Sequence, residues 1–172
     1  MGRCYIVAID PDIDKNGVAF IEKSRREVEL DSLTFPETLE RVKSIYRGYK
    51  EYTEIGGMAT FKVYVEAGWL NKGNWHIDEV RGRKMSPQAW AAAVGKKDGQ
   101  CAAVSQKLIE CFEYYGIPVT PIRPLRKCWK GKDRKITHEE LAREMALYRV
   151  SFPYKRTNQE TRDAALIALV NL

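Results

Sequence analysis

The chain has 172 residues, of which 44% are hydrophobic and 30% are charged, the composition of an ordinary globular protein. This length predicts a single domain over residues 1–172, because one domain commonly takes roughly 100 to 200 residues. No apolar run approaches the roughly 18 residues of a membrane span, and the 4 cysteines form no CxxC pair. We therefore expect neither a membrane protein nor a secreted one, but a protein with reduced thiols in a cytosol-like compartment.

Positive charge is concentrated in one segment of the chain. Lys and Arg number 29 against 23 Asp and Glu, a net charge of +6. Residues 123–135 (RPLRKCWKGKDRK) hold seven basic residues and one acid, so this basic segment alone carries +6 and the rest of the chain is neutral. A localised excess of this kind indicates a polyanionic partner.

Taken in chain order, the hydrophobic pattern predicts strands first. Residues 4–10 (CYIVAID) are a nearly continuous apolar run, typical of a central strand buried on both faces. Residues 17–21 and 27–35 predict two further strands. Pro36 then begins a helix whose apolar residues recur at helical spacing as far as Tyr49.

Strands and helices alternate after this point. Residues 61–67 (FKVYVEA) predict a fourth strand, residues 100–115 a helix, and residues 117–122 a short strand. Residues 68–98 hold three of the 4 Trp residues and receive no element, so an expanded loop region is expected there.

Two helices close the chain. Thr137 and Glu140 form the T-x-x-E pattern of a capping box, which predicts a helix to about Tyr148. A last, Ala-rich helix starts near Asn158 and continues to the C-terminus. This order of elements predicts an α/β fold, with a mixed sheet covered by helices on its faces.

Acids stand at three places where they could meet. Asp10 and Glu66 each end a predicted buried strand, and sites in open α/β sheets form beyond the carboxyl ends of strands. Glu160 and Asp163 are three residues apart on the last helix and so share a face. Carboxylates brought together repel each other, and a hard divalent cation such as Mg²⁺ removes that repulsion.

Most of these acids also have a simpler interpretation. Asp10 could merely end a strand, and Glu160 could be a solvated residue favoured by the helix dipole. Asp12 and Asp14 fit a turn. Asp163 is harder to explain in this way, because its helix is apolar and unpaired buried acids are rare.

The order of these motifs resembles that of the ribonuclease H-like nucleases, and within them the RuvC-type Holliday-junction resolvases. The matching motifs are AIDPD with NGVAFIE after it, VYVEAGW, GQCAAVSQKLIECFEYYGIPV and ETRDAALIAL. The resemblance spans nearly the whole chain in the same order. It implies a ribonuclease H-like mixed five-stranded sheet with helices on both faces, and an endodeoxyribonuclease that cleaves four-way DNA junctions.

The resemblance also implies the cofactor and the site. In such enzymes the acids hold two Mg²⁺ or Mn²⁺ ions, which by position places catalytic metal ligands at Asp10, Glu66, Glu160 and Asp163. The implied reaction is hydrolysis of a phosphodiester by water, leaving 5′-phosphate and 3′-hydroxyl ends. The implied location is the cytoplasm of a bacterial cell or of a phage-infected host.

The expected partners are branched DNA and a second copy of the chain. A four-way junction has near two-fold symmetry, which a homodimer would match by presenting two sites to two opposed strands. The helix expected over residues 100–115 is the candidate interface.

Three departures from the family pattern bear on substrate choice. Asp12 follows the Asp-Pro pair where the family usually has glycine, and Glu160 stands where aspartate is frequent, so Glu160 could bind metal through water. The segment 68–98 is expanded and rich in Trp and Gly.

Nucleic-acid contacts are expected from the basic segment. The candidate residues are Arg126, Lys127, Trp129, Lys130, Lys132, Arg134 and Lys135. Lys132 is the residue that we favour for the scissile phosphate. Trp129 could stack on an unpaired base, or pack against the sheet with its N–H satisfied, and both alternatives stay open.

A second, looser basic set is expected in a solvated loop that becomes ordered on DNA. It consists of Arg81, Arg83, Lys84, Lys96 and Lys97.

Two other functions stay open at the level of the sequence. One is a related nuclease that acts on RNA or on flap and fork DNA. The other is a non-catalytic nucleic-acid-binding module of the same fold, against which the intact set of acids argues.

Overall fold

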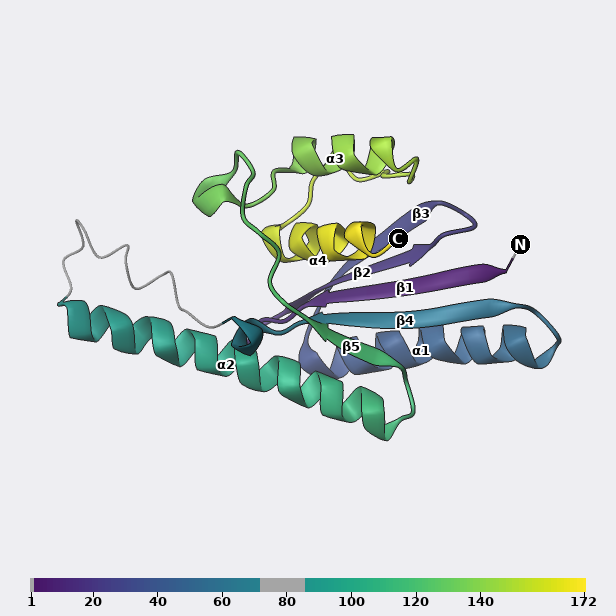
Figure 1. Cartoon of the computed structure of the whole chain (residues 1–172), viewed down its shortest axis with the longest axis horizontal. Coiled ribbons are helices and arrows are strands. Elements are labelled where there is room, and N and C mark those ends of the chain that lie inside the picture. Colours follow the sequence, from purple (N-terminus) through teal and green to yellow (C-terminus); the bar gives the residue numbers. More distant parts are fainter. Residues whose placement is uncertain (1, 72–85) are drawn as a thin grey trace.

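A computed structural model describes residues 2–71 and 86–172, and within them the chain forms a twisted sheet with helices on both faces (Figure 1). The strands are β1 (Arg3–Asp10), β2 (Asn16–Glu22), β3 (Glu27–Leu33), β4 (Ala59–Glu66) and β5 (Val119–Ile122). The helices are α1 (Phe35–Glu54), α2 (Pro87–Tyr114), α3 (His138–Leu147) and α4 (Gln159–Val170). Two short 3₁₀ turns are η1 (Gly68–Leu70) and η3 (Lys132–Arg134).

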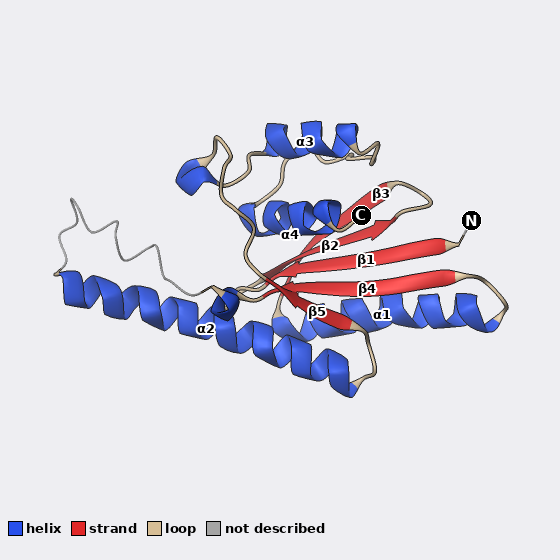
Figure 2. Cartoon of the chain, in the orientation of Figure 1, coloured by secondary structure: helices blue, strands red, loops and turns tan. Residues whose placement is uncertain are grey.

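The sheet is mixed, with the strand order β3-β2-β1-β4-β5 (Figure 2). Strand β2 runs antiparallel to both β1 and β3, whereas β1, β4 and β5 are parallel to one another. The predicted ribonuclease H-like five-stranded α/β sheet is therefore confirmed. The single-domain organisation of residues 1–172 stays a prediction.

The central strand β1 is buried on both faces, as its apolar run predicts. Ile6 and Ala8 point into the hydrophobic cluster beneath α4, while Tyr5, Val7 and Ile9 point into the cluster beneath α1 and α2. This alternation follows from the two-residue period of a strand. Even-numbered positions of β1 therefore face α4.

Helix α4 lies between the sheet and α3 (Figure 1). Seven of its 12 residues are buried, which explains why the helix is rich in small apolar residues. The helix starts near Asn158 as predicted, and Asn158 caps it, since its Oδ1 accepts a hydrogen bond from the Thr161 amide at 2.8 Å. The predicted capping box of α3, formed by Thr137 and Glu140, is also present.

Helix α2 differs most from the expectation. It begins at Pro87 and runs for 28 residues, so part of the expected loop over residues 68–98 is helical. Ser86 caps it, with its Oγ accepting from the Ala89 amide at 3.2 Å. Ser86 followed by Pro87 is a helix-start signal. The prediction did not use it, because the helical spacing of apolar residues is clear only over residues 100–115.

The structure describes only two of the five residues in the second, looser basic set. Lys96 and Lys97 were expected in a loop but lie in α2, while Arg81, Arg83 and Lys84 lie outside the described residues.

Although α2 is long, no helix in the described ranges is apolar enough over sufficient length to cross a membrane.

Candidate active site

Asp10 and Glu66 are brought together by the parallel pairing of β1 with β4. Each is the last residue of its strand, and the pairing of Ile9 with Val65 makes them the next positions along the ladder. Both follow the alternation of Ala8 and Tyr64, whose side chains lie in the cluster beneath α4. The two carboxylates therefore lie next to each other at the carboxyl ends of β1 and β4, on the same face of the sheet.

The N-terminal turn of α4 supplies the other two predicted acids, Glu160 and Asp163. It can approach the sheet closely because Gly17 of β2, the pairing partner of Asp10, has no side chain. A β-carbon on Gly17 would overlap the carbonyl oxygen of Glu160. The glycine therefore lets the α4 backbone rest beside Asp10.

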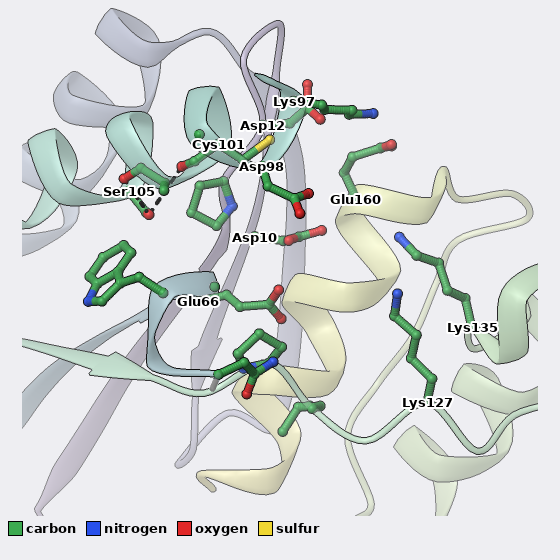
Figure 3. Close-up of a pocket in the computed structure, with 18 residues that line it drawn as sticks. Asp10, Asp12, Glu66, Lys97, Asp98, Cys101, Ser105, Lys127, Lys135 and Glu160 are labelled. Atoms are coloured by element: carbon green, nitrogen blue, oxygen red, sulfur yellow. Dashed lines mark hydrogen bonds between the residues drawn. The ribbon is translucent and has the colours of Figure 1, made fainter. Parts of the chain in front are cut away.

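The acids line two adjoining cavities. The larger has a volume of about 660 Å³ and is lined by Asp10, Glu66 and Glu160. Lys127 and Lys135 also line it, across from Asp10 and Glu66 (Figure 3). Asp163 lines a smaller cavity of about 90 Å³, which shares Asp10, Glu66 and both lysines with the larger one. The structure thus gathers all four predicted acids in one region, while their roles stay predictions.

The electrostatics of this region are unfavourable for the carboxylates alone. Burial, followed by the charges of Glu66 and Asp163, raises the pKa of Asp10 well above its ordinary value. Burial and the charge of Asp163 raise the pKa of Glu66 to about 7, although Lys135 and Lys127 act in the opposite direction. The site carries more negative charge than the surrounding residues neutralise.

Lys135 provides part of the neutralisation. Its Nζ donates a hydrogen bond to Asp163 Oδ2 at 3.0 Å. Burial by itself lowers the pKa of Lys135, but the carboxylates of Asp163, Asp10 and Glu66 outweigh it and raise the pKa above its ordinary value. Lys135 therefore stays charged at the edge of the carboxylate cluster.

The donor chemistry of the cluster fits the expected cation. All four groups are carboxylates, the oxygen ligands that Mg²⁺ prefers, and their mutual repulsion is what a divalent ion would relieve. As the side chains stand, no group of three or more His, Cys, Asp or Glu residues in the described ranges is gathered closely enough to hold a metal ion. Metal ligation is thus supported by the chemistry of the donors alone, and it stays a prediction.

The basic segment reaches the site through only part of its residues. Those that line at least one of the two cavities are Arg126, Lys127, Trp129, Arg134 and Lys135. Lys130 and Lys132 are exposed and are not among the lining residues. The preference for Lys132 at the scissile phosphate is therefore not supported, since it is Lys135 that approaches the carboxylates.

Trp129 packs as one of the two alternatives predicted, but with a difference. Its indole lies partly buried against the hydrophobic cluster beneath α4, as the packing alternative requires. Its buried Nε1, however, has no hydrogen-bond partner in the part of the chain that the structure describes. The packing part of that alternative is thus present, whereas the satisfied N–H stays a prediction; Trp129 also lines the smaller cavity.

The larger cavity is also lined by residues that the sequence analysis did not single out. Trp69 of η1 lies there with Cys101 and Ser105 of α2. Trp69 had a usable signal, because it stands three residues after Glu66. The two α2 residues had none, since only the packing of α2 against β4 and β5 brings them to the cavity.

The fold and the site together define a ribonuclease H-like α/β fold with carboxylates gathered at the ends of β1 and β4 and at the start of α4, and with two lysines beside them. The chain is similar to the solved structure of Thermus thermophilus RuvC in complex with a Holliday junction substrate, at 18% sequence identity and a TM-score of 0.45, over 96% of this chain and 90% of that one. It is also similar to a second Thermus thermophilus RuvC structure, at 15% identity and a TM-score of 0.41, over 96% of this chain and 91% of that one. No protein-family model and no curated protein matches the sequence.

Proposed function

We propose that this chain is a metal-dependent endonuclease that hydrolyses phosphodiester bonds in branched DNA, with four-way junctions as the preferred substrate. The observation that carries the proposal is one cavity with carboxylates on one side and the ammonium groups of Lys127 and Lys135 on the other. Carboxylates bind hard divalent cations, and ammonium groups bind phosphate oxygens. A phosphodiester between the two sides would meet both requirements.

The acids would share the cofactor among them. Asp10, Glu66 and Asp163 would bind the Mg²⁺ or Mn²⁺ ions directly, and the longer Glu160 directly or through water. Bound there, the ions would supply Lewis-acid activation of the attacking water and stabilisation of the leaving 3′ oxygen.

The lysines of the chain would hold the substrate in place. Lys135 takes over the role that the sequence had suggested for Lys132, because its Nζ lies within 3.0 Å of an acid of the cluster. Its ammonium group would exchange part of its contact with Asp163 for a phosphate oxygen of the scissile group. Lys127 lines the same cavity and would contact a neighbouring phosphate.

The remaining basic residues extend the phosphate-binding surface away from the cavity. Lys130 and Lys132 are exposed next to the cavity-lining part of the same loop, where they would contact the DNA backbone without regard to sequence. Branched DNA suits such a site, because its unpaired or distorted crossover leaves room for a phosphodiester to enter a cavity.

A homodimer is part of the proposal, with α2 as the interface. The near two-fold symmetry of a four-way junction calls for two sites related by an isologous contact. The first half of α2 extends past the sheet, and its residues 95–100 are exposed (Figure 1). Sedimentation at micromolar concentration with junction DNA tests this, and a strict monomer that cuts both opposed strands would remove the symmetry argument.

The nuclease activity is tested on a panel of synthetic substrates. Four-way junctions, flaps, forks, linear duplex and RNA–DNA hybrid are incubated with Mg²⁺, Mn²⁺ or EDTA, with Asp10→Asn as the matched control. We expect paired nicks with 5′-phosphate ends on the junction and none in EDTA. Faster cleavage of flaps or hybrid would identify the related-nuclease alternative, and binding without cleavage under every ion would identify the non-catalytic module.

A further inference from the structure

Hydrogen bonds connect Asp163 with Gln159 and Arg162, two residues that have no role in the proposed reaction. Gln159 Nε2 donates to Asp163 Oδ1 at 2.8 Å, while Lys135 Nζ donates to Oδ2 at 3.0 Å. Each oxygen of this carboxylate is therefore held by a donor from a different segment. The Asp163 side chain cannot rotate without breaking one of the two bonds.

The orientation of the Gln159 amide is determined by Arg162. Arg162 Nη2 donates to Gln159 Oε1 at 2.8 Å. A guanidinium group can only donate, so the amide oxygen of Gln159 must face Arg162 and its NH₂ must face Asp163. Arg162 thereby ensures that Gln159 is a donor to the carboxylate.

Arg162 also holds the segment that carries Lys135. Its Nε donates to the carbonyl oxygen of Ile136 at 2.9 Å, and its Nη1 donates to the carbonyl oxygen of Thr157 at 2.5 Å. Ile136 directly follows Lys135 in the chain. One guanidinium therefore connects the backbone beside Lys135 with the amide that holds Asp163.

These bonds are not needed to cap α4. The cap is formed by Asn158, whose Oδ1 accepts from the Thr161 amide. Gln159 and Arg162 are both half-buried. One bond of Arg162 reaches the Thr157 carbonyl just before the cap, but the other bonds join Gln159, Asp163 and the Ile136 carbonyl. Their arrangement calls for an explanation outside helix formation.

We propose that Gln159 and Arg162 are positioning residues that hold the Asp163 carboxylate and the Lys135 ammonium in a fixed mutual arrangement. The inference rests on the proposed function and deepens it. Gln159 aims the carboxylate toward Asp10 and Glu66, and Arg162 keeps Lys135 where it can contact a phosphate oxygen while it stays beside Asp163. Residues that orient metal ligands in this way typically contribute 10- to 100-fold to metal affinity or activity, as an order of magnitude.

Two substitutions separate the two parts of this arrangement. Gln159→Met keeps the length of the side chain but removes the donor to Asp163. Arg162→Lys keeps the charge but loses the planar fork that reaches three acceptors at once. Arg143→Lys is the matched control, because Arg143 is an exposed arginine of α3 outside both cavities whose Nε donates to the Glu139 carbonyl oxygen at 3.3 Å.

The readouts are Mn²⁺ affinity by calorimetry, kcat and KM on a four-way junction, and the melting temperature. For Gln159→Met we expect Mn²⁺ affinity and kcat to fall by about 10-fold or more, with KM for DNA unchanged. For Arg162→Lys we expect the same loss and a raised KM, because the Lys135 segment is released as well. Arg143→Lys should match the wild type in every readout.

The outcomes distinguish this inference from the function on which it rests. If the wild type neither binds Mn²⁺ nor cleaves, the proposed function is overturned and the positioning role with it. If the wild type does both and Gln159→Met retains its Mn²⁺ affinity and kcat, only the positioning role is overturned. A variant whose melting temperature falls while its Mn²⁺ affinity stays constant also overturns it, because that result is a general loss of stability.

Discussion

Gly17 of β2 and Glu160 of α4 approach so closely that no side chain fits between them. A β-carbon on Gly17 would overlap the Glu160 carbonyl and would lie 2.8 Å from the Thr161 amide nitrogen. Gly17 is also the sheet partner of Asp10. Gly17, which has no functional side chain, therefore determines how closely α4, with Glu160 and Asp163, can lie to Asp10.

Gly17→Ala should push the N-terminal turn of α4 away from the sheet. We expect the free energy of unfolding to fall by about 1–3 kcal/mol, the usual cost of overpacking, and cleavage to be lost with it. Denaturant unfolding and junction cleavage measure the two effects. Gly48→Ala in α1 is the control, since its added β-carbon meets nothing within 4 Å and should stabilise the helix by up to about 1 kcal/mol. A Gly17→Ala protein as stable and active as the wild type would contradict this account of the site.

Removal of single charges should stop catalysis without preventing DNA binding. Asp10→Asn, Glu66→Gln and Asp163→Asn each remove one expected metal ligand and should abolish cleavage. Glu160→Gln should be milder if that residue binds through water. Gel-shift and cleavage assays on one junction measure both properties, with the exposed turn residue Asp14→Asn as the control. Wild-type cleavage rates in the first three variants would refute the site assignment.

The stability of the metal-free protein should fall as the pH rises. The pKa of Glu66 is raised from 4.5 to about 7 in the folded state, so the folded state binds more protons than the unfolded state between these values. The free energy of unfolding must then decrease as the pH rises through this window. If Glu66 titrated alone, the loss would be on the order of 3 kcal/mol. Denaturant unfolding in EDTA from pH 4 to 8 measures it.

Two comparisons test the origin of this pH dependence. Glu66→Gln should reduce the slope between about pH 4.5 and 7, leaving the part that Asp10 contributes. Glu51→Gln on the exposed side of α1 should leave the slope unchanged. Saturating Mg²⁺ should raise the melting temperature near pH 7 in the wild type more than in Asp10→Asn, because an ion that binds the folded state alone stabilises it. An equal shift in both proteins would place the bound ion elsewhere.

The exposed lysines of the basic segment should contribute to DNA affinity through counterion release. Replacing Lys130 and Lys132 together with Ala should weaken binding to all sequences and reduce the slope of log affinity against log salt by about two, at about 0.9 per phosphate contact. Binding titrations at several salt concentrations measure the slope. Lys50→Ala, an exposed lysine of α1, should leave it unchanged. An unaltered slope in the double variant would show that DNA binds over another surface.

Local patterns in the sequence were sufficient to predict much of this protein. The apolar run that ends in Asp10 predicted a strand buried on both faces, because a two-residue period and hydrophobicity act within a few residues. The T-x-x-E pattern of Thr137 and Glu140 predicted the start of α3 for the same reason, since its hydrogen bonds join neighbours in the chain. The placement of acids at two strand ends and on one face of the last helix also predicted the four carboxylates that line the two cavities.

Only the tertiary structure decided which lysine meets them. Asp133 and Arg134 both adopt left-handed backbone conformations, with φ of 54° and 57°, which turn the chain sharply before Lys135. The carboxylate of Glu140 accepts from the amides of Lys130 and Thr137, each at 3.1 Å, and so holds both ends of this loop. Lys132 and Lys135 look equivalent in the sequence. The left-handed residues between them and the hydrogen bonds to Glu140 that hold the loop produce no repeating pattern of residues that could be recognised there. The same holds for Gly17 and for Arg162, whose roles depend on contacts between segments far apart in the chain.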